Sequence, residues 1–501
     1  MASEILCRVS FTAEVDQALS AWRAKTQLTY VRTATIEKRA AAVRAVRAEL
    51  EKPTRRQYYN LITLYHEQIA LLDEMLAGTP ASIWRGEMRY YQNASGTICC
   101  RCGENEITIG DDQPAASTLA CTKVTRKARL SMITAMASGK VFAATGPPGS
   151  GKTETIKDIC HMLGMQAQVI NCNETLREAP KEAIEAALKS GGSKCPVVFD
   201  EFNRLGAEAM TAIVEATAAK TFAAVTFNPA SATAMPEALT ANLVEQPMSK
   251  PDLTPILQVM LAHEGFLKCD ELGRALSATV AACEEKTSAC AFYDFGLRFC
   301  RSVVKTAGGL GRARGFADEA QLLADTLAGI LYVRSTAADK PIVLEQIKQG
   351  VGVAAALPAT FEAEAGITAR IGAMVAEQAK VRHGLAIVGG VVDTDALVGA
   401  IDAVMGAESV VLREPAEALL GAGGPFERAL EVAATKGAPV NLVVATRLTT
   451  AQAEPLHTLL DDNKAFRGVK LAANVRVILL DDDCALWSPA LVSRVGIVAA
   501  L

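Results

Sequence analysis

The sequence has few aromatic residues and no long, uninterrupted apolar run. Aromatics make up 5% of the 501 residues, although half of the residues are apolar. Abundant alanine with few aromatics favours a helix-rich α/β architecture over a β-sandwich. No stretch of about eighteen apolar residues occurs, and the opening MASEILCRVSFT lacks the apolar core of a secretory signal. We therefore expect neither a membrane span nor a membrane partner.

Strong charge of either sign is also missing. The formal net charge is -4 at pH 7, and no cluster of lysine and arginine is dense enough to follow a phosphate backbone. We therefore expect no nucleic-acid partner.

The thirteen cysteines do not form a metal-binding pattern. Cys99, Cys100 and Cys102 are close together, with Cys121 nearby. However, separated Cys-x-x-Cys pairs and a companion histidine are absent. His66 precedes a glutamate but has no second histidine four residues later, as a HExxH zinc motif requires. We interpret the clustered cysteines as thiols of a strand.

Apolar spacing divides the chain into four segments. Residues 1–92 are predicted to be mainly helical, and residues 93–250 alternate apolar strands with helices, as a parallel sheet requires. Residues 251–340 are predicted to be helical again. In residues 341–501 the strand-and-glycine theme returns in GLAIVGG, NLVVAT and NVRVILL. The chain therefore reads as two related modules in tandem.

The stretch ATGPPGSGKTET, residues 143–154, carries the clearest chemistry. It fills the pattern Gly-x-x-x-x-Gly-Lys-Ser/Thr between an apolar strand and a helix. In such a loop, backbone N–H groups cradle phosphates, the lysine neutralises the β- and γ-phosphates, and the hydroxyl reaches Mg²⁺. We predict that the nucleotide-binding residues are Gly146, Pro147, Pro148, Gly149, Ser150, Gly151, Lys152, Thr153 and Glu154.

A second apolar strand, VVFDEFNR at residues 197–204, ends in adjacent carboxylates. We expect Asp200 to hold Mg²⁺ together with Thr153, and Glu201 to polarise the attacking water. The strand FAAVTFN ends in Asn228, an uncharged group that we expect to orient that water. The combination predicts hydrolysis of ATP with Mg²⁺ as cofactor.

These motifs resemble the motor region of dynein heavy chains. FDEFNR with GPPGSGKTET resembles the first AAA+ module, and EKPTRRQYYNLITLYHEQIALLDEML is similar to the end of the dynein linker. FNPASATAMPEAL resembles the sensor segment, and FYDFGLRFCRSVVKTAG the small helical subdomain. The resemblance implies an α/β fold of tandem P-loop AAA+ modules behind a helical linker segment. It also implies that Arg298 is the sensor arginine that closes over the nucleotide.

The second module resembles the start of the second dynein module but has lost the residues for catalysis. Asp395 stands where the pattern places the lysine, and Ala445 and Thr446 stand where carboxylates are needed. Because a carboxylate repels a triphosphate, we expect weak or no binding and no hydrolysis there. SPALVSRVGIV is similar to the segment of the family that carries an arginine finger. The resemblance therefore implies that Arg494 reaches the γ-phosphate at the first module, a contact worth on the order of 10³ to 10⁵ in rate.

The resemblance implies a dynein-like ATPase that belongs to a microtubule-based motor, cytoplasmic or axonemal. Gln246 before Pro247 departs from the family pattern. No coiled-coil stalk or microtubule-binding tip is recognisable, so we expect microtubules to be indirect partners and other dynein chains or AAA+ modules to complete a ring. Two alternatives stay open: a self-assembling AAA+ remodelling ATPase, and a non-catalytic scaffold that binds ATP.

Overall fold

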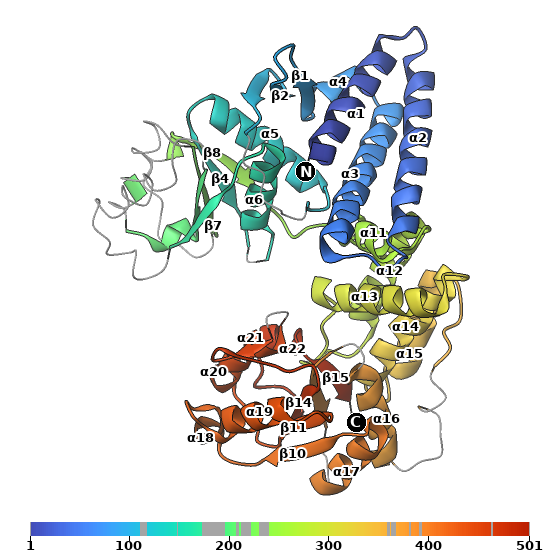
Figure 1. Ribbon diagram of the computed structural model, residues 1–501, viewed down its shortest axis with the longest axis vertical. Helices are drawn as coiled ribbons and strands as arrows, with labels where there is room; N and C mark the ends of the chain where they lie inside the picture. Colours follow the sequence, from blue (N-terminus) through green and yellow to red (C-terminus); the bar gives the residue numbers. More distant parts are fainter. Residues whose placement is uncertain are drawn as a thin grey trace. The chain divides into compact units, whose positions relative to one another are not determined.

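The computed structural model forms two compact units, Met1–Leu267 and Lys268–Leu501, which are described separately (Figure 1). The structure describes residues 2–110, 118–147, 149–172, 196–206, 210–211, 222–229, 240–357, 361, 367–379, 382–389, 393–461 and 464–499.

Unit 1 begins with helices α1 (Ala2–Ser20), α2 (Ala24–Ala45), α3 (Lys52–Ala77) and α4 (Pro80–Arg85). Pro53 lies in the first turn of α3, where its missing N–H would have no helical partner anyway. The four helices share an apolar core that includes Val15, Leu28, Leu72 and Trp84. This segment is helical, as its apolar spacing predicts.

A three-stranded antiparallel sheet follows, made of β1 (Arg89–Gln92), β2 (Ile98–Cys102) and β3 (Asn105–Thr108). The clustered cysteines lie on β2, where Cys100 and Cys102 are buried. Burial raises the pKa of Cys100 to about 12, so this thiol stays protonated and packs as a small apolar group. Within the described ranges, no group of three or more His, Cys, Asp or Glu side chains could hold a metal ion.

The first parallel sheet positions the candidate site. Its strands are β4 (Val141–Thr145), β5 (Gln168–Asn171), β6 (Val197–Asp200), β7 (Ala223–Phe227) and β8 (Leu243–Pro247), in the spatial order β5-β6-β7-β4-β8. Helices α5 (Lys123–Ala137) and α6 (Lys152–Met162) pack on it, and α11 (Leu253–Glu264) ends the unit. Since all neighbouring strands are parallel, the segments that follow β4, β6 and β7 meet at one edge.

Unit 2 starts with helices α12 (Cys269–Lys286), α13 (Leu297–Arg314), α14 (Glu319–Arg334) and α15 (Lys340–Val351), and α16 (Ile367–Ala379) precedes the second sheet. The strands of that sheet are β9 (Gly384–Val388), β10 (Glu408–Leu412), β11 (Val440–Val444), β14 (Val475–Asp481) and β15 (Gly496–Ala499). The other described elements are α17 (Thr394–Met405), α18 (Ala416–Leu420), α19 (Pro425–Thr435), α20 (Thr450–Ala453), a 3-10 helix (Glu454–Leu456), α21 (His457–Leu460), the hairpin β12 (Ala465–Phe466) and β13 (Val469–Lys470), and α22 (Pro489–Val492).

The second sheet repeats the first. Its parallel strands lie in the order β10-β11-β14-β9-β15, which is the same order relative to the chain as in the first sheet. The tandem α/β architecture expected from the repeated strand-and-glycine theme is therefore confirmed. Among the helices that the structure describes, none is long and apolar enough to cross a lipid bilayer.

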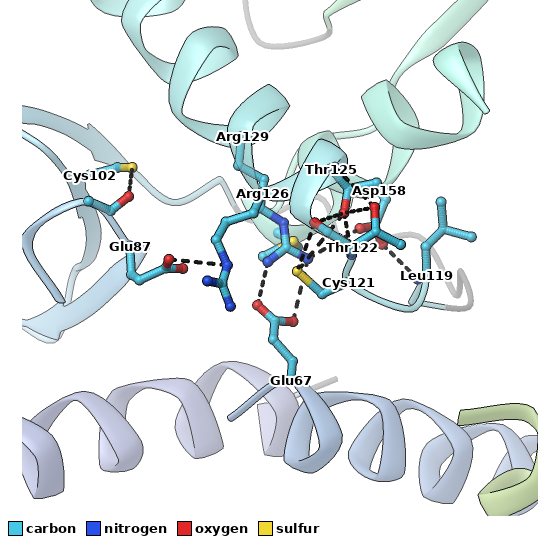
Figure 2. A network of polar contacts seen from close by, with 12 residues as sticks. Glu67, Glu87, Cys102, Leu119, Cys121, Thr122, Thr125, Arg126, Arg129 and Asp158 are labelled. Atoms are coloured by element: carbon cyan, nitrogen blue, oxygen red, sulfur yellow. Dashed lines mark hydrogen bonds and ion pairs between the residues drawn. The ribbon is translucent and has the colours of Figure 1, made fainter. Parts of the chain in front are cut away.

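A buried cluster of charges joins the N-terminal helices of unit 1 to the helices of its sheet (Figure 2). The guanidinium of Arg129 on α5 forms an ion pair with Glu67 on α3 and lies 3.8 Å from the carboxylate of Asp158 on α6. The side chains of Arg129 and Asp158 are only 4% and 5% exposed. Asp158 also accepts a hydrogen bond from the N–H of Leu119. The cluster therefore ties α3, α5 and α6 together.

The two carboxylates respond differently to this burial. Desolvation raises the pKa of both groups, but Arg129 and Arg8 outweigh it at Glu67 and hold the pKa of that carboxyl below its usual value. At Asp158 desolvation prevails and the pKa is raised, despite the opposing effect of Arg129. This agrees with the geometry, in which the guanidinium lies closer to Glu67 than to Asp158.

Replacing Glu67 by glutamine should destabilise unit 1 by about 3 kcal/mol, because the buried Arg129 then loses its closest counter-charge. Urea unfolding of the variant and the parent chain measures this loss. A matched control is Glu74→Gln, on the same helix. Glu74 is half exposed and pairs with Arg126, so the control should lose less than about 1 kcal/mol. Equal losses in the two variants would contradict the assigned role of the buried pair.

Candidate functional site

The loop between β4 and α6 is shaped by glycines. Gly146 has φ 152°, and its N–H donates to the carbonyl oxygen of Phe227 at 3.1 Å. A Cβ at this position would lie 2.1 Å from the carbonyl oxygen of Met248, so no other residue fits. Gly149 and Gly151 have φ of 74° and 79°, in the left-handed region that glycine adopts most easily. The glycines of the motif therefore determine the path of the loop.

The loop folds around the ammonium group of Lys152, the first residue of α6. Its Nζ donates to the carbonyl oxygens of Gly146 and Pro147, each at 2.9 Å. Burial lowers the pKa of Lys152, an effect that the charges of Asp200 and Glu201 oppose. Because a helix N-terminus carries unpaired N–H groups and a partial positive charge, this end of α6 suits a phosphate.

The other predicted loop residues have smaller roles in the structure. The hydroxyl of Ser150 is buried and donates to the carbonyl oxygen of Pro147 at 2.9 Å, which tightens the loop. Glu154 lies in the first turn of α6, where it forms an ion pair with Lys157 at 2.5 Å. Pro148 lies outside the described residues.

Asp200, at the end of β6, meets the loop. The hydroxyl of Thr153 donates to its Oδ1 at 2.5 Å, although the two residues are 47 positions apart in the chain. A second hydroxyl, that of Thr226 on β7, donates to the same Oδ1, also at 2.5 Å. Neither hydroxyl uses Oδ2. Hydroxyl and carboxylate oxygens are the ligands that Mg²⁺ prefers, so Thr153 and Asp200 fit this ion.

Glu201 follows directly and has an unusual backbone. Its φ of 57° and ψ of 43° are left-handed, which is uncommon for a residue with a side chain. Its N–H donates to the hydroxyl oxygen of Thr226 at 3.1 Å, and its carboxylate pairs with Arg204 at 2.9 Å. Both partners of this ion pair are more than half exposed, so little energy holds the carboxylate there.

The last predicted residue of the first module, Asn228, follows β7. Since β7 is the neighbour of both β6 and β4 in the sheet, Asn228 lies at the same edge as Asp200. Its carbonyl oxygen accepts a hydrogen bond from the side chain of Asn203 at 3.4 Å, which connects it to the segment that carries Glu201.

In unit 2, the two predicted arginines line one cavity of about 650 Å³. Arg298 donates from Nη1 to the hydroxyl of Ser493 at 2.7 Å, and Arg494 donates from Nη1 to the carbonyl oxygen of Ala490 at 2.7 Å. Burial lowers the pKa of Arg494, and the charge of Arg298 lowers it further, while Asp461 opposes both. Six cationic side chains line this basic cavity: Arg298, Arg301, Lys305, Arg382, Lys464 and Arg494.

At the corresponding edge of the second sheet, the side chains make different contacts. The carboxylate of Asp393 caps α17 by accepting hydrogen bonds from the N–H groups of Asp395 and Ala396, each at 3.0 Å. Asp395 itself forms an ion pair with Arg413 at 2.5 Å. An internal carboxylate thus bonds to the helix N-terminus where the first module would bind phosphate. After β11 in the chain, the hydroxyl of Thr446 donates to the backbone carbonyl oxygen of Glu414.

Sequence reasoning missed two features, one in each unit. One is Thr226, although it is the single polar residue of the strand AAVTF and two residues before Asn228. The other is the set of additional cations in the basic cavity. Of these, Arg301 and Lys305 follow Arg298 at helical spacing on α13, so their shared face could have been read from the sequence. Arg382 and Lys464 come from distant segments that give no such signal.

Comparison with known proteins identifies the relatives of the chain. Residues 113–221 and 215–391 match a family model described as the hydrolytic ATP binding site of the dynein motor region. Together the two matches span residues 113–391, which is 279 of 501 residues.

Individual relatives are similar over part of the chain. Dynein axonemal heavy chain 6 of Homo sapiens is 32% identical over 46% of this chain. The dynein beta chain of the flagellar outer arm of Chlamydomonas reinhardtii is 28% identical over 55%, and the cytoplasmic dynein heavy chain of Neurospora crassa is 29% identical over 61%. The aligned regions are only 6%, 6% and 8% of the lengths of these three relatives.

Proposed function

This chain belongs to the dynein motor-region family, and from that premise we propose that it binds and hydrolyses Mg·ATP at its first module. The observation that carries the proposal is the convergence of Thr153, from the phosphate loop, on Asp200 at the end of β6. It places the oxygen ligands for a cation beside a cationic loop and next to a second carboxylate, that of Glu201. This is the set of groups that phosphoryl transfer from ATP requires.

Each predicted residue of the first module has its own role in this proposal. The loop N–H groups and the N-terminus of α6 bind the phosphates, and the ammonium of Lys152 moves from its loop carbonyls to the β- and γ-phosphates. Thr153 and Asp200 would hold Mg²⁺, which supplies charge neutralisation on the phosphate oxygens when bound. Glu201 leaves Arg204 to polarise the attacking water, and Asn228 orients that water.

Arg298 and Arg494 complete this site in the proposal, as sensor arginine and arginine finger for the nucleotide of the first module. Their position on one basic cavity supports a shared anionic ligand. Arg298 donates to a hydroxyl and Arg494 to a backbone carbonyl, both neutral acceptors. The carboxylate of Asp461 also acts on Arg494, but the six cations of the cavity outnumber it, which favours an anionic ligand.

The second module is proposed to be inactive. An internal carboxylate caps the helix that would bind phosphate, and no carboxylate follows β11 in the two positions Ala445 and Thr446. The predicted segment boundaries at residues 92, 250 and 340 remain predictions.

At the level of the cell, we propose a part in a microtubule-based motor, because the relatives are named as axonemal, flagellar and cytoplasmic dynein chains. Other AAA+ modules or dynein chains complete the ring, microtubules are indirect partners, and the cytoskeleton of cytoplasm or axoneme is the location. The family match does not favour a self-assembling remodelling ATPase or a non-catalytic scaffold.

Replacing Glu201 by glutamine should lower steady-state ATP turnover at least 100-fold, because general-base assistance to the water is lost. Binding of ATP should change little, since the loop and the ligands of Mg²⁺ are intact. The assay is phosphate release by the purified chain. Glu104→Gln, which alters an exposed carboxylate of the same unit outside the loop, is the control with parental turnover. Unchanged turnover in the Glu201 variant would favour the scaffold.

The chain should bind a single ATP, and replacing Lys152 by alanine should remove that binding because the loop loses its only ammonium group. Equilibrium binding of a fluorescent ATP analogue gives the stoichiometry. Lys157→Ala, on the surface of the same helix, should bind like the parent. Residual binding of one equivalent in the Lys152 variant would show that the second module retains nucleotide.

Arg494→Ala should lower kcat on the order of 10³-fold, the effect of losing an arginine finger, with a smaller change in ATP affinity. Arg447→Ala serves as a matched control, because Arg447 lies in the same unit but pairs with Asp483. Single-turnover hydrolysis separates the chemical step from binding. A parental rate of hydrolysis in the Arg494 variant would show that Arg494 is not the arginine finger of the first module.

A further inference from the structure

The hydroxyl of Thr226 forms hydrogen bonds with both acidic residues of the first module, Asp200 and Glu201. Its side chain is completely buried on β7. The hydroxyl accepts a hydrogen bond from the N–H of Glu201 at 3.1 Å and donates one to Oδ1 of Asp200 at 2.5 Å. A backbone N–H can only donate, and the carboxylate oxygen of Asp200 accepts, so the direction of each bond follows from its partner. The single hydroxyl proton of Thr226 therefore points at Asp200.

The first consequence concerns the orientation of Asp200. Its Oδ1 accepts from two hydroxyls, that of Thr153 on helix α6 and that of Thr226 on the neighbouring strand β7. Thr153 and Asp200 would hold Mg²⁺ together, and the ion would supply charge neutralisation on the phosphate oxygens. The completely buried hydroxyl of Thr226 would orient this carboxylate from the side of the sheet, because it bonds to Oδ1 and not to Oδ2.

The second consequence concerns the backbone of Glu201. A left-handed conformation is unfavourable for a residue with a Cβ, yet it is required here because the chain turns sharply from β6 into the short helix Phe202–Arg204. The hydrogen bond from the N–H of Glu201 to Thr226 fixes this turn. The direction in which the carboxylate of Glu201 leaves the backbone therefore depends on the same hydroxyl.

We propose that Thr226 is a positioning residue of the ATPase site: one buried hydroxyl sets both the cation ligand Asp200 and the general base Glu201. This inference rests on the proposed function of the first module and adds a residue to it. Thr226 itself touches neither nucleotide nor water in this assignment. Its effect on the reaction passes through the two carboxylates.

The test replaces Thr226 by valine, which keeps the shape of the side chain and removes the hydroxyl. Two quantities are measured. The first is the gain in ATP affinity on adding Mg²⁺, taken as the ratio of the dissociation constants in EDTA and in Mg²⁺. The second is kcat. We expect kcat to fall about 10- to 100-fold, as for the loss of hydrogen bonds to a charged group. The Mg²⁺-dependent gain should fall several-fold, and binding in EDTA should stay within about 2-fold.

Two further variants separate positioning from stability. Thr226→Ser restores the hydroxyl and should recover both quantities. Thr12→Val removes a buried hydroxyl with the same pattern, since Thr12 donates to the carbonyl oxygen of Arg8 and accepts from the N–H of Tyr90. This control should lower the melting temperature as much as Thr226→Val while leaving kcat and the Mg²⁺-dependent gain at the parental values.

A parental Mg²⁺-dependent gain and a parental kcat in Thr226→Val would overturn the proposal, as would an equal loss of ATP affinity with and without Mg²⁺. A wild-type chain that binds Mg·ATP without turning it over would instead overturn the proposed hydrolysis. In that case the ratio of dissociation constants alone decides the role of Thr226, because it needs no turnover.

Discussion

The first module depends on a single carboxylate oxygen, Oδ1 of Asp200. It receives hydroxyl hydrogen bonds from residues 47 and 26 positions away in the chain, so the phosphate loop, the acidic strand end and the neighbouring strand β7 converge on one atom. The strand order makes this possible, because β7 lies between β6 and β4 and all three are parallel. In the proposed Mg·ATP site, these bonds fix the position of Asp200, which reduces the reorganisation needed at the moment of reaction.

Helix α6 is held at two places. Its N-terminus belongs to the phosphate loop, while Asp158 near its middle faces Arg129, whose other partner is Glu67 on α3 (Figure 2). A buried ion pair tolerates little displacement, because separating the charges in a low-dielectric interior is expensive. The N-terminal helices and the phosphate loop of unit 1 are therefore mechanically connected through charged groups, not through apolar packing alone.

Much of this could be read from the sequence, for identifiable reasons. The glycine loop, Thr153, Asp200 and Glu201 are local motifs whose spacing encodes their geometry, and the repeated strands of the second module share the periodicity of the first. The hydroxyl of Thr226 escaped notice because a lone threonine is a favourable residue in any strand. The buried charges around Arg129 could not be predicted, because they come from three helices that are distant in sequence. Nothing in the local sequence specifies which charges will be buried together.

In the proposed function the second module keeps the fold without the chemistry, and Arg494 gives a physical reason to keep the fold. Arg494 lies between the short helix α22 and strand β15, and β15 pairs with β9 along its whole length. The arginine therefore has a defined position only when the second sheet is complete. The sequence of that module has Asp395 in place of the lysine, and Ala445 and Thr446 in place of the carboxylates. In their place, Asp393 satisfies the N-terminus of α17 and Arg413 neutralises Asp395, which removes the need for an anion to stabilise that helix end.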